Sequence, residues 1–277
     1  MIYLLLAILS SSLVSIFMRL STHRVQNRYS LLAVNYLACS VLGAIYARGN
    51  VFCVAAPGYG PMLIMGLVAG ALYLLGFVLL QRSIRKNGMV LSSLFMKLGL
   101  LVPIVMSLVF FRELPSILQC VGFLLAIGAI LLINWQKGSR SGFNTGLLIL
   151  LLAGGSCDAI SKVYEQLGNP VLSDQFLFFT FFFAFILCIA LVLRQKEAPG
   201  KQELLFGLLI GIPNFFSAKF LLAALTRMNA VVVYPTFSVA TLLVVTLTGL
   251  FLFKERLSKQ QWIALGMILL ALIALNI

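Results

Sequence analysis

The chain has 277 residues, of which 62% are hydrophobic and only 10% are charged, and its mean hydropathy is +1.10. A soluble domain usually carries about 25% charged residues, so this composition excludes an ordinary soluble protein and indicates an all-α polytopic membrane protein. The formal net charge of +13 would suggest a nucleic-acid partner in a soluble protein, but the basic residues lie in short segments between apolar runs, and we expect no nucleic-acid binding.

Ten apolar segments of membrane-spanning length follow one another along the chain. We predict spans at residues 2–20, 30–47, 61–81, 88–110, 116–134, 144–163, 174–193, 203–225, 229–252 and 259–276. The first apolar run starts at Ile2 with no basic residue before it, and Arg19, Arg24 and Arg28 follow at its end, which is opposite to the charge order of a cleaved signal peptide. We therefore predict that this segment is retained as a span.

Basic residues favour one orientation of these spans. The loops after odd-numbered spans hold fourteen Lys and Arg residues, whereas those after even-numbered spans hold Arg48, Arg112 and Arg227, with Lys162 near a helix end. The positive-inside rule then predicts that the odd-numbered loops are cytoplasmic and that both termini face outward. We expect a multi-pass protein of the bacterial cytoplasmic membrane, embedded in the lipid bilayer.

The sequence repeats itself after 142 positions, which is about half its length. Glu113 follows one long apolar run, and Glu255 follows another in the same way. The hydrophilic stretch 135–144 separates two halves, residues 1–137 and 138–277, with five predicted spans each. Because an odd number of spans reverses the direction of the second half, we predict two inverted repeats, as in many transporters.

Two matching blocks carry a family resemblance. They are Phe110–Phe111–Arg112–Glu113 with Gln119 and Gly122, and Leu252–Phe253–Lys254–Glu255 with Gln261 and Gly266. With these blocks and its ten-span layout, the chain resembles the EamA-like branch of the drug/metabolite transporter superfamily. The resemblance implies that spans one to four and six to nine surround a central cavity, with spans five and ten packed outside. It also implies transport of small metabolites, often amino acids, nucleotide bases or sugars, and frequently their export.

One departure from the superfamily narrows the function. Its small multidrug branch uses a membrane-embedded glutamate in the first span. Here that span carries Ser10, Ser11, Ser12, Ser15 and Arg19, without a carboxylate. We therefore do not expect proton-coupled export of cationic drugs by that mechanism.

Two lysines lie deep within predicted spans, where an ionisable side chain costs about 3 kcal/mol on insertion scales. Lys97 shares a helical face with Ser93, and Pro103 follows on the same side. We predict that Lys97 and Ser93 face a substrate cavity; the alternative is a structural lysine bonded to carbonyls of neighbouring helices. Lys219 follows the Pro213–Asn214 pair and is a second predicted substrate contact.

Aromatic residues occupy matched positions in the two halves. The repeat shift lays Lys219 on Phe77, and Phe215 and Tyr73 each lie one helical turn earlier. Such residues can clamp a flat or anionic substrate from two sides with the help of cation–π contacts. The alternative is that Phe77 and Phe215 are ordinary packing residues in a chain with 22 phenylalanines.

Asp158 is the only carboxylate deep in a predicted span, and Lys162 lies four residues later on the same helical face. One interpretation is a self-neutralising structural pair. The other makes Asp158, with Lys162, a proton- or ion-coupling site, or makes Asp158 the partner of a substrate ammonium group.

Further candidates are polar residues inside spans. Asn35, Asn214 and Tyr234 can donate hydrogen bonds to a substrate, although polar side chains also join neighbouring helices. Glu113 and Glu255 lie at span ends, where we expect them to anchor helices.

The residue pattern argues against an enzyme. His23 is the sole histidine, no P-loop is present, and the five cysteines are scattered without metal-ligand spacing. We expect no catalytic residues, no cofactor and no metal.

Together these patterns predict a secondary transporter of small metabolites, working by alternating access as a monomer or homodimer. Arg19, Lys97, Lys162 and Lys219 outnumber Asp158 within the spans, which favours amino acids or related anionic or zwitterionic solutes, with export as the expected direction. A flippase for a lipid-linked substrate and a membrane subunit without its own transport cycle remain as alternatives.

Overall fold

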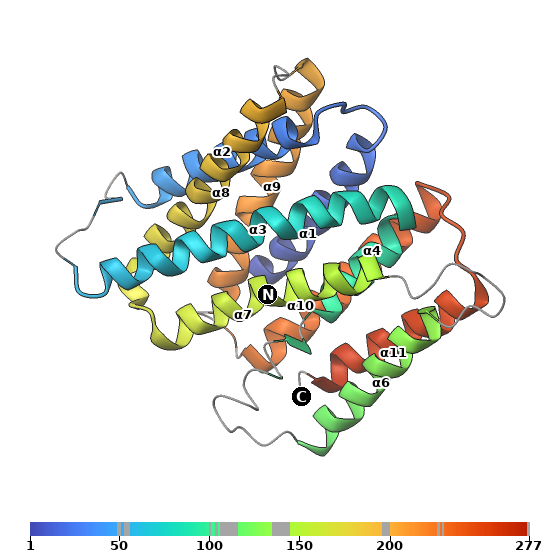
Figure 1. Cartoon of the computed structure of the whole chain (residues 1–277). Helices are drawn as coiled ribbons and strands as arrows, with labels where there is room; N and C mark the ends of the chain where they lie inside the picture. Colours follow the sequence, from blue (N-terminus) through green and yellow to red (C-terminus); the bar gives the residue numbers. More distant parts are fainter. Residues whose placement is uncertain are drawn as a thin grey trace.

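The protein forms a bundle of α-helices in its computed structural model, which describes residues 1–48, 51–52, 56–99, 101–102, 105, 116–134, 145–195, 200–225, 228 and 230–275 (Figure 1). No strand occurs in these ranges. The helices are α1 (Ile2–Ser21), α2 (Arg28–Tyr46), α3 (Tyr59–Asn87), α4 (Met89–Leu98), α6 (Ile117–Asn134), α7 (Thr145–Leu167), η1 (Pro170–Leu172), α8 (Ser173–Gln195), α9 (Lys201–Leu225), α10 (Ala230–Phe251) and α11 (Lys259–Leu275).

The helix positions agree with the apolar segments predicted from the sequence. Helices α1, α2, α3, α8 and α9 are long and apolar enough to cross a membrane, and the remaining α-helices contain shorter apolar stretches. Many large apolar side chains also lie exposed on the outside of the bundle, as lipid-facing residues do. The protein is therefore an integral membrane protein.

The helices pack in a central group and a peripheral pair. In the central group α1 contacts α9 and α10, α7 contacts α3 and α4, α2 contacts α8 and α9, and α8 also contacts α3. Helices α6 and α11 pack along each other at one edge of the bundle (Figure 1), and α11 also contacts α4 and α10. This arrangement agrees with the family expectation that the fifth span of each half packs outside.

Small residues allow the closest helix contacts. Gly70 of α3 faces the backbone of α8, where a Cβ at Gly70 would lie 2.6 Å from the carbonyl oxygen of Thr180. Gly207 and Gly211 of α9 face α2 in the same way, and a Cβ at Gly211 would lie 2.7 Å from the carbonyl oxygen of Asn35. Such Gly-xxx-Gly pairs are the usual means by which helices approach closely in a membrane.

Substituting Gly70 tests this packing. Because a Cβ would meet backbone that cannot turn away, Gly70→Ala should lower the free energy of unfolding by about 1–3 kcal/mol, the usual cost of overpacking. Gly266→Ala in α11 is the matched control, since a Cβ there meets nothing within 4 Å. Thermal unfolding of both purified variants in detergent measures the difference, and equal midpoints would contradict this account of the α3–α8 contact.

Candidate functional site

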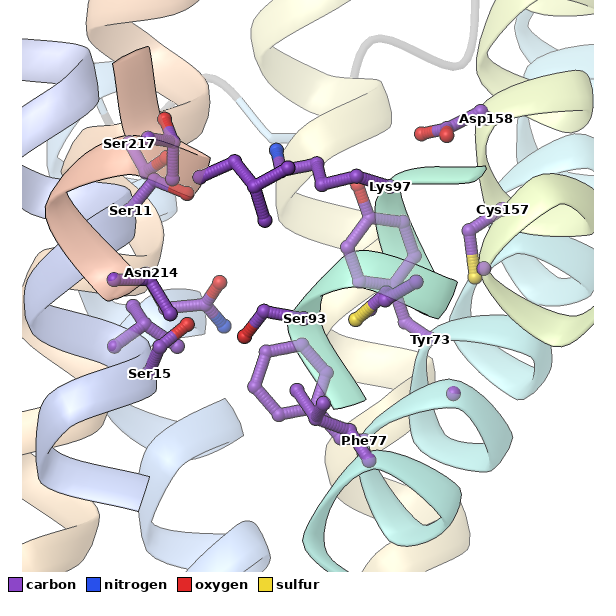
Figure 2. Close-up of a pocket in the computed structure, with 18 residues that line it drawn as sticks. Ser11, Ser15, Tyr73, Phe77, Ser93, Lys97, Cys157, Asp158, Asn214 and Ser217 are labelled. Atoms are coloured by element: carbon purple, nitrogen blue, oxygen red, sulfur yellow. The ribbon is translucent and has the colours of Figure 1, made fainter. Parts of the chain in front are cut away.

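A cavity of about 180 Å3 lies inside the central group of helices (Figure 2). Six helices line it, namely α1, α3, α4, α7, α9 and α10. Its walls comprise Ser11, Val14, Ser15, Tyr73, Gly76, Phe77, Leu80, Ser93, Met96, Lys97, Gly154, Cys157, Asp158, Asn214, Ser217, Thr241, Leu242 and Val245. The predicted site residues Tyr73, Phe77, Ser93, Lys97, Asp158 and Asn214 therefore share one cavity.

Lys97 and Asp158 give the cavity two opposite charges. They come from different helices, α4 and α7, and interact electrostatically. The Lys97 Nζ atom lies 4.4 Å from the centre of the Phe237 ring, which offers a cation–π contact. Asp158 is exposed, and Figure 2 shows its side chain at the wall of the cavity. Among the described side chains, the two direct ion pairs lie elsewhere.

Neutral polar groups occupy another part of the cavity wall. Figure 2 shows Ser15, Ser93 and Asn214 directed into the same region of the cavity, next to the Phe77 ring. Asn35 of α2 lies behind Asn214 and accepts a 3.3 Å hydrogen bond from its Nδ2 atom. Asn35 is fully buried and does not line the cavity, so its place is to support Asn214.

Besides Asn35, two residues predicted as substrate contacts lie outside the cavity, namely Lys219 and Phe215. The Lys219 Nζ atom makes a 2.7 Å ion pair with Asp174 at the start of α8 and lies 4.9 Å from the Tyr46 ring centre. Phe215 is 1% exposed, and its ring packs against those of Tyr46 and Phe216. The shift of 142 residues aligns Phe215 with Tyr73 and Lys219 with Phe77, and both Tyr73 and Phe77 line the cavity. Lys219 instead pairs with Asp174, an acidic residue that is distant in sequence.

The side chains of Lys162 and Tyr234 lie outside the described residues, as does Glu113. Their predicted roles therefore remain predictions.

Sequence reasoning did not single out several wall residues. Ser11, Ser217, Thr241 and Cys157 all line the cavity. The serine run in the first span was an available signal, since hydroxyls on an otherwise apolar helix often face an internal surface. Nothing in the sequence distinguished Thr241 from hydroxyls that bond to their own helix.

Glu255 joins the ends of several helices. Its two carboxylate oxygens accept hydrogen bonds from the backbone N–H groups of Met89 and Val90, at 2.7 and 3.1 Å, at the start of α4. The same carboxylate lies 3.2 Å from the guanidinium of Arg19 at the end of α1. Negative charge at a helix N-terminus is favourable, so the helix-end role expected for Glu255 agrees with its contacts. Arg19 is consequently paired here and is not a cavity charge.

The comparisons with known proteins agree with this fold. Residues 144–277 match the model of the EamA-like transporter family, which belongs to the drug/metabolite transporter superfamily. This match, over the second half of the chain, confirms the resemblance predicted from the sequence.

Relatives extend the similarity to the rest of the chain. A protein from Haemophilus influenzae, described as uncharacterized, is 26% identical over 196 residues, which are 68% of this chain and 67% of that protein. A solved structure, described only as the crystal structure of a protein, superimposes with a TM-score of 0.63 at 16% identity and covers 99% of this chain and 94% of the other. The latter similarity concerns the fold alone.

Removing the Glu255 carboxylate tests its role at the helix ends. Glu255→Ala leaves two N–H groups and Arg19 without their acceptor, so the free energy of unfolding should fall by about 2 kcal/mol. Arg256→Ala, an exposed neighbour, should change it by no more than about 0.5 kcal/mol. Denaturation of the detergent-solubilised proteins compares the two. A Glu255→Ala protein as stable as Arg256→Ala would show that these contacts contribute nothing.

Proposed function

We propose that this protein is a secondary transporter that carries small zwitterionic metabolites, such as amino acids or related solutes, across the membrane by alternating access. The observation that carries the proposal is the presence of Lys97 and Asp158, from the neighbouring helices α4 and α7, on the wall of one internal cavity. A carboxylate of the solute would lie near Lys97 and its ammonium group near Asp158. Each charged group of the solute would then exchange its contact with water for a contact with an oppositely charged side chain of the protein.

Ion pairing elsewhere in the bundle favours a zwitterion over an anion. Four basic residues were expected at or near the cavity, but Arg19 and Lys219 are neutralised by Glu255 and Asp174. Among the described side chains this leaves Lys97 and Asp158 on the cavity wall, one charge of each sign. A solute with a single charge would leave one of them unpaired inside the membrane, which is costly.

The helix contacts support two equivalent halves. Exchanging α1 with α7, α2 with α8, α3 with α9, α4 with α10 and α6 with α11 converts the α1–α9 contact into α7–α3, α2–α9 into α8–α3, and α1–α10 into α7–α4. Each of these contacts is present. The cavity-lining helices also form three exchanged pairs. We infer that residues 1–137 and 138–277 are inverted repeats surrounding a shared site.

The Glu255 contacts suit a rocking movement between these halves. Glu255 belongs to the second half, whereas Arg19, Met89 and Val90 belong to the first. The contacts therefore join the halves at one end of the bundle and must break when that end opens. By the positive-inside rule this end is cytoplasmic. Export then begins with release of Glu255 and entry of the solute from the cytoplasm.

Asp158 is also the residue we assign to coupling. Its carboxylate lies on the wall of the cavity, where it can bind a proton or a cation in exchange for the solute. Proton movement in the opposite direction would drive the solute outward. The neighbouring Lys162 belongs to the same predicted coupling group.

Neutralising Lys97 tests the proposal. Lys97→Met retains the length and apolar stem of the side chain but removes the charge that would hold the solute carboxylate. Transport of labelled amino acids into proteoliposomes should fall by at least about 100-fold, since losing a buried charge partner costs about 3–5 kcal/mol. The variant should still elute as a single species and keep its helical circular dichroism.

Lys219→Met is the matched control, because Lys219 also lies within a span but outside the cavity. This variant should be less stable yet retain transport. Full transport by Lys97→Met, or movement of labelled lipid between leaflets with no solute flux, would contradict the proposal; the second result would favour the flippase.

A further inference from the structure

The cavity has two layers of different chemistry. Each lining helix can be followed from the end where Glu255 lies. On α1, α3 and α4 the wall residues nearer that end are Ser15, Phe77 and Ser93, and those one turn farther away are Ser11, Tyr73 and Lys97. On α9 the nearer residue is Asn214, and Ser217 follows. Figure 2 shows the same order, with Lys97 and Asp158 on one side and Ser15, Ser93 and Asn214 on the other. We call these the charged layer and the neutral layer.

The neutral layer contains a hydroxyl without a partner. Ser93 is 7% exposed, and its Oγ atom has no hydrogen-bond partner among the described residues. Thr241 lines the same cavity from α10, one turn farther from the Glu255 end than Val245 and therefore level with the charged layer; it is 2% exposed, and its Oγ1 atom is likewise unpartnered among the described residues. Several other hydroxyls in the bundle bond to their own helix, as Ser12 does to the carbonyl of Ile8 at 2.8 Å, whereas Ser30, Thr180 and Thr246, outside the cavity, are unpartnered as well among the described residues. A buried hydroxyl left unpaired costs about 1–3 kcal/mol, so a cavity that keeps such groups is prepared for a polar ligand atom.

Asn214 adds a positioned amide to this layer. Its Nδ2 atom donates to Asn35 at 3.3 Å and approaches the Cys39 sulfur at 3.6 Å, both on α2. These contacts fix the plane of the amide from behind. The amide therefore faces the cavity in a fixed orientation, which favours recognition of one kind of group over general adaptability.

We propose that the neutral layer selects zwitterionic solutes whose side chain carries its own neutral hydrogen-bonding group, a hydroxyl or a carboxamide. The inference rests on the proposed transport function and adds a specificity to it. The charged layer binds the ammonium and carboxylate groups of the solute. The side chain of the solute points toward the Glu255 end, where Ser93 and Asn214 form hydrogen bonds with its polar atom.

The dimensions agree with this orientation. The two layers are separated by one helical turn, about 5.4 Å. This is comparable to the reach from the charged groups of an amino acid to the polar atom of a short side chain. The Phe77 ring beside the neutral layer would cover the apolar carbons of that side chain.

Isosteric pairs of amino acids test the selectivity. Threonine and valine have nearly the same shape but differ in one hydroxyl, and asparagine and leucine differ similarly in a carboxamide. A purely apolar pocket rejects the added hydroxyl only weakly, whereas a site that bonds the hydroxyl strongly rejects the analogue without it. Isothermal titration of the purified full-length protein should give tighter binding of the polar member in at least one pair, by at least about tenfold.

Adjacent serines on α4 provide the matched variants. Ser93→Ala should reduce the polar-to-apolar affinity ratio by about tenfold, the value of one hydrogen bond near the upper end of its usual range. Ser92→Ala should leave the ratio unchanged, because Ser92 bonds to Gly88 and Ser83 and lies outside the cavity.

The possible results distinguish failure of this selectivity from failure of the proposed transport function. Equal binding within both pairs, or preference for the apolar members, would overturn the selectivity while leaving zwitterion transport in place. An unchanged ratio in Ser93→Ala would also overturn it. If none of the four amino acids binds and proteoliposomes show no flux, the proposed function fails together with the inference.

Discussion

The cost of placing charge in a membrane is the constraint on which this structure depends. Every ionisable group within the bundle must find a partner or reach an aqueous space. Arg19 and Lys219 satisfy this requirement through ion pairs with Glu255 and Asp174. Lys97 and Asp158 do so differently, since both line the internal cavity. The helices that surround the cavity thus enclose a site whose electrostatics a zwitterion would complete.

Tight helix packing and breakable polar contacts have separate places in the bundle. Gly70 and Gly211 allow α3 and α9 to approach α8 and α2 closely, backbone against backbone, and these contacts hold the helices of the bundle together. The Glu255 carboxylate instead binds Arg19 and the start of α4 through polar contacts, which water can replace when one end of the cavity opens. A carrier requires both properties, a firm framework and an end that can open.

Much of this arrangement could be predicted from the sequence. Hydropathy located the helices, and the repeated glutamate is the basis of the two-half arrangement that we propose. Because charged residues are rare in lipid, Lys97 and Asp158 were predicted as site residues, and both line the cavity. Pairing between distant residues could not be read in this way. Lys219 was predicted for the same reason as Lys97, because a lysine within a span is rare. Its ion-pair partner Asp174 lies on another helix, so only the packed structure shows that Lys219 is ion-paired whereas Lys97 lines the cavity. Ser93 was found only because it shares a face with Lys97, and Thr241 could not be distinguished from the many hydroxyls in helices that bond to their own backbone.

The central claim is that one solute meets Lys97 and Asp158 at the same time. Titration of the purified protein with a bound amino acid and with its two singly blocked analogues, the N-acetyl derivative and the carboxamide, tests it most directly. The account predicts that each analogue binds at least about 100-fold more weakly than the parent, because each leaves one charge of the cavity unpaired. An analogue that binds as tightly as the parent would contradict it.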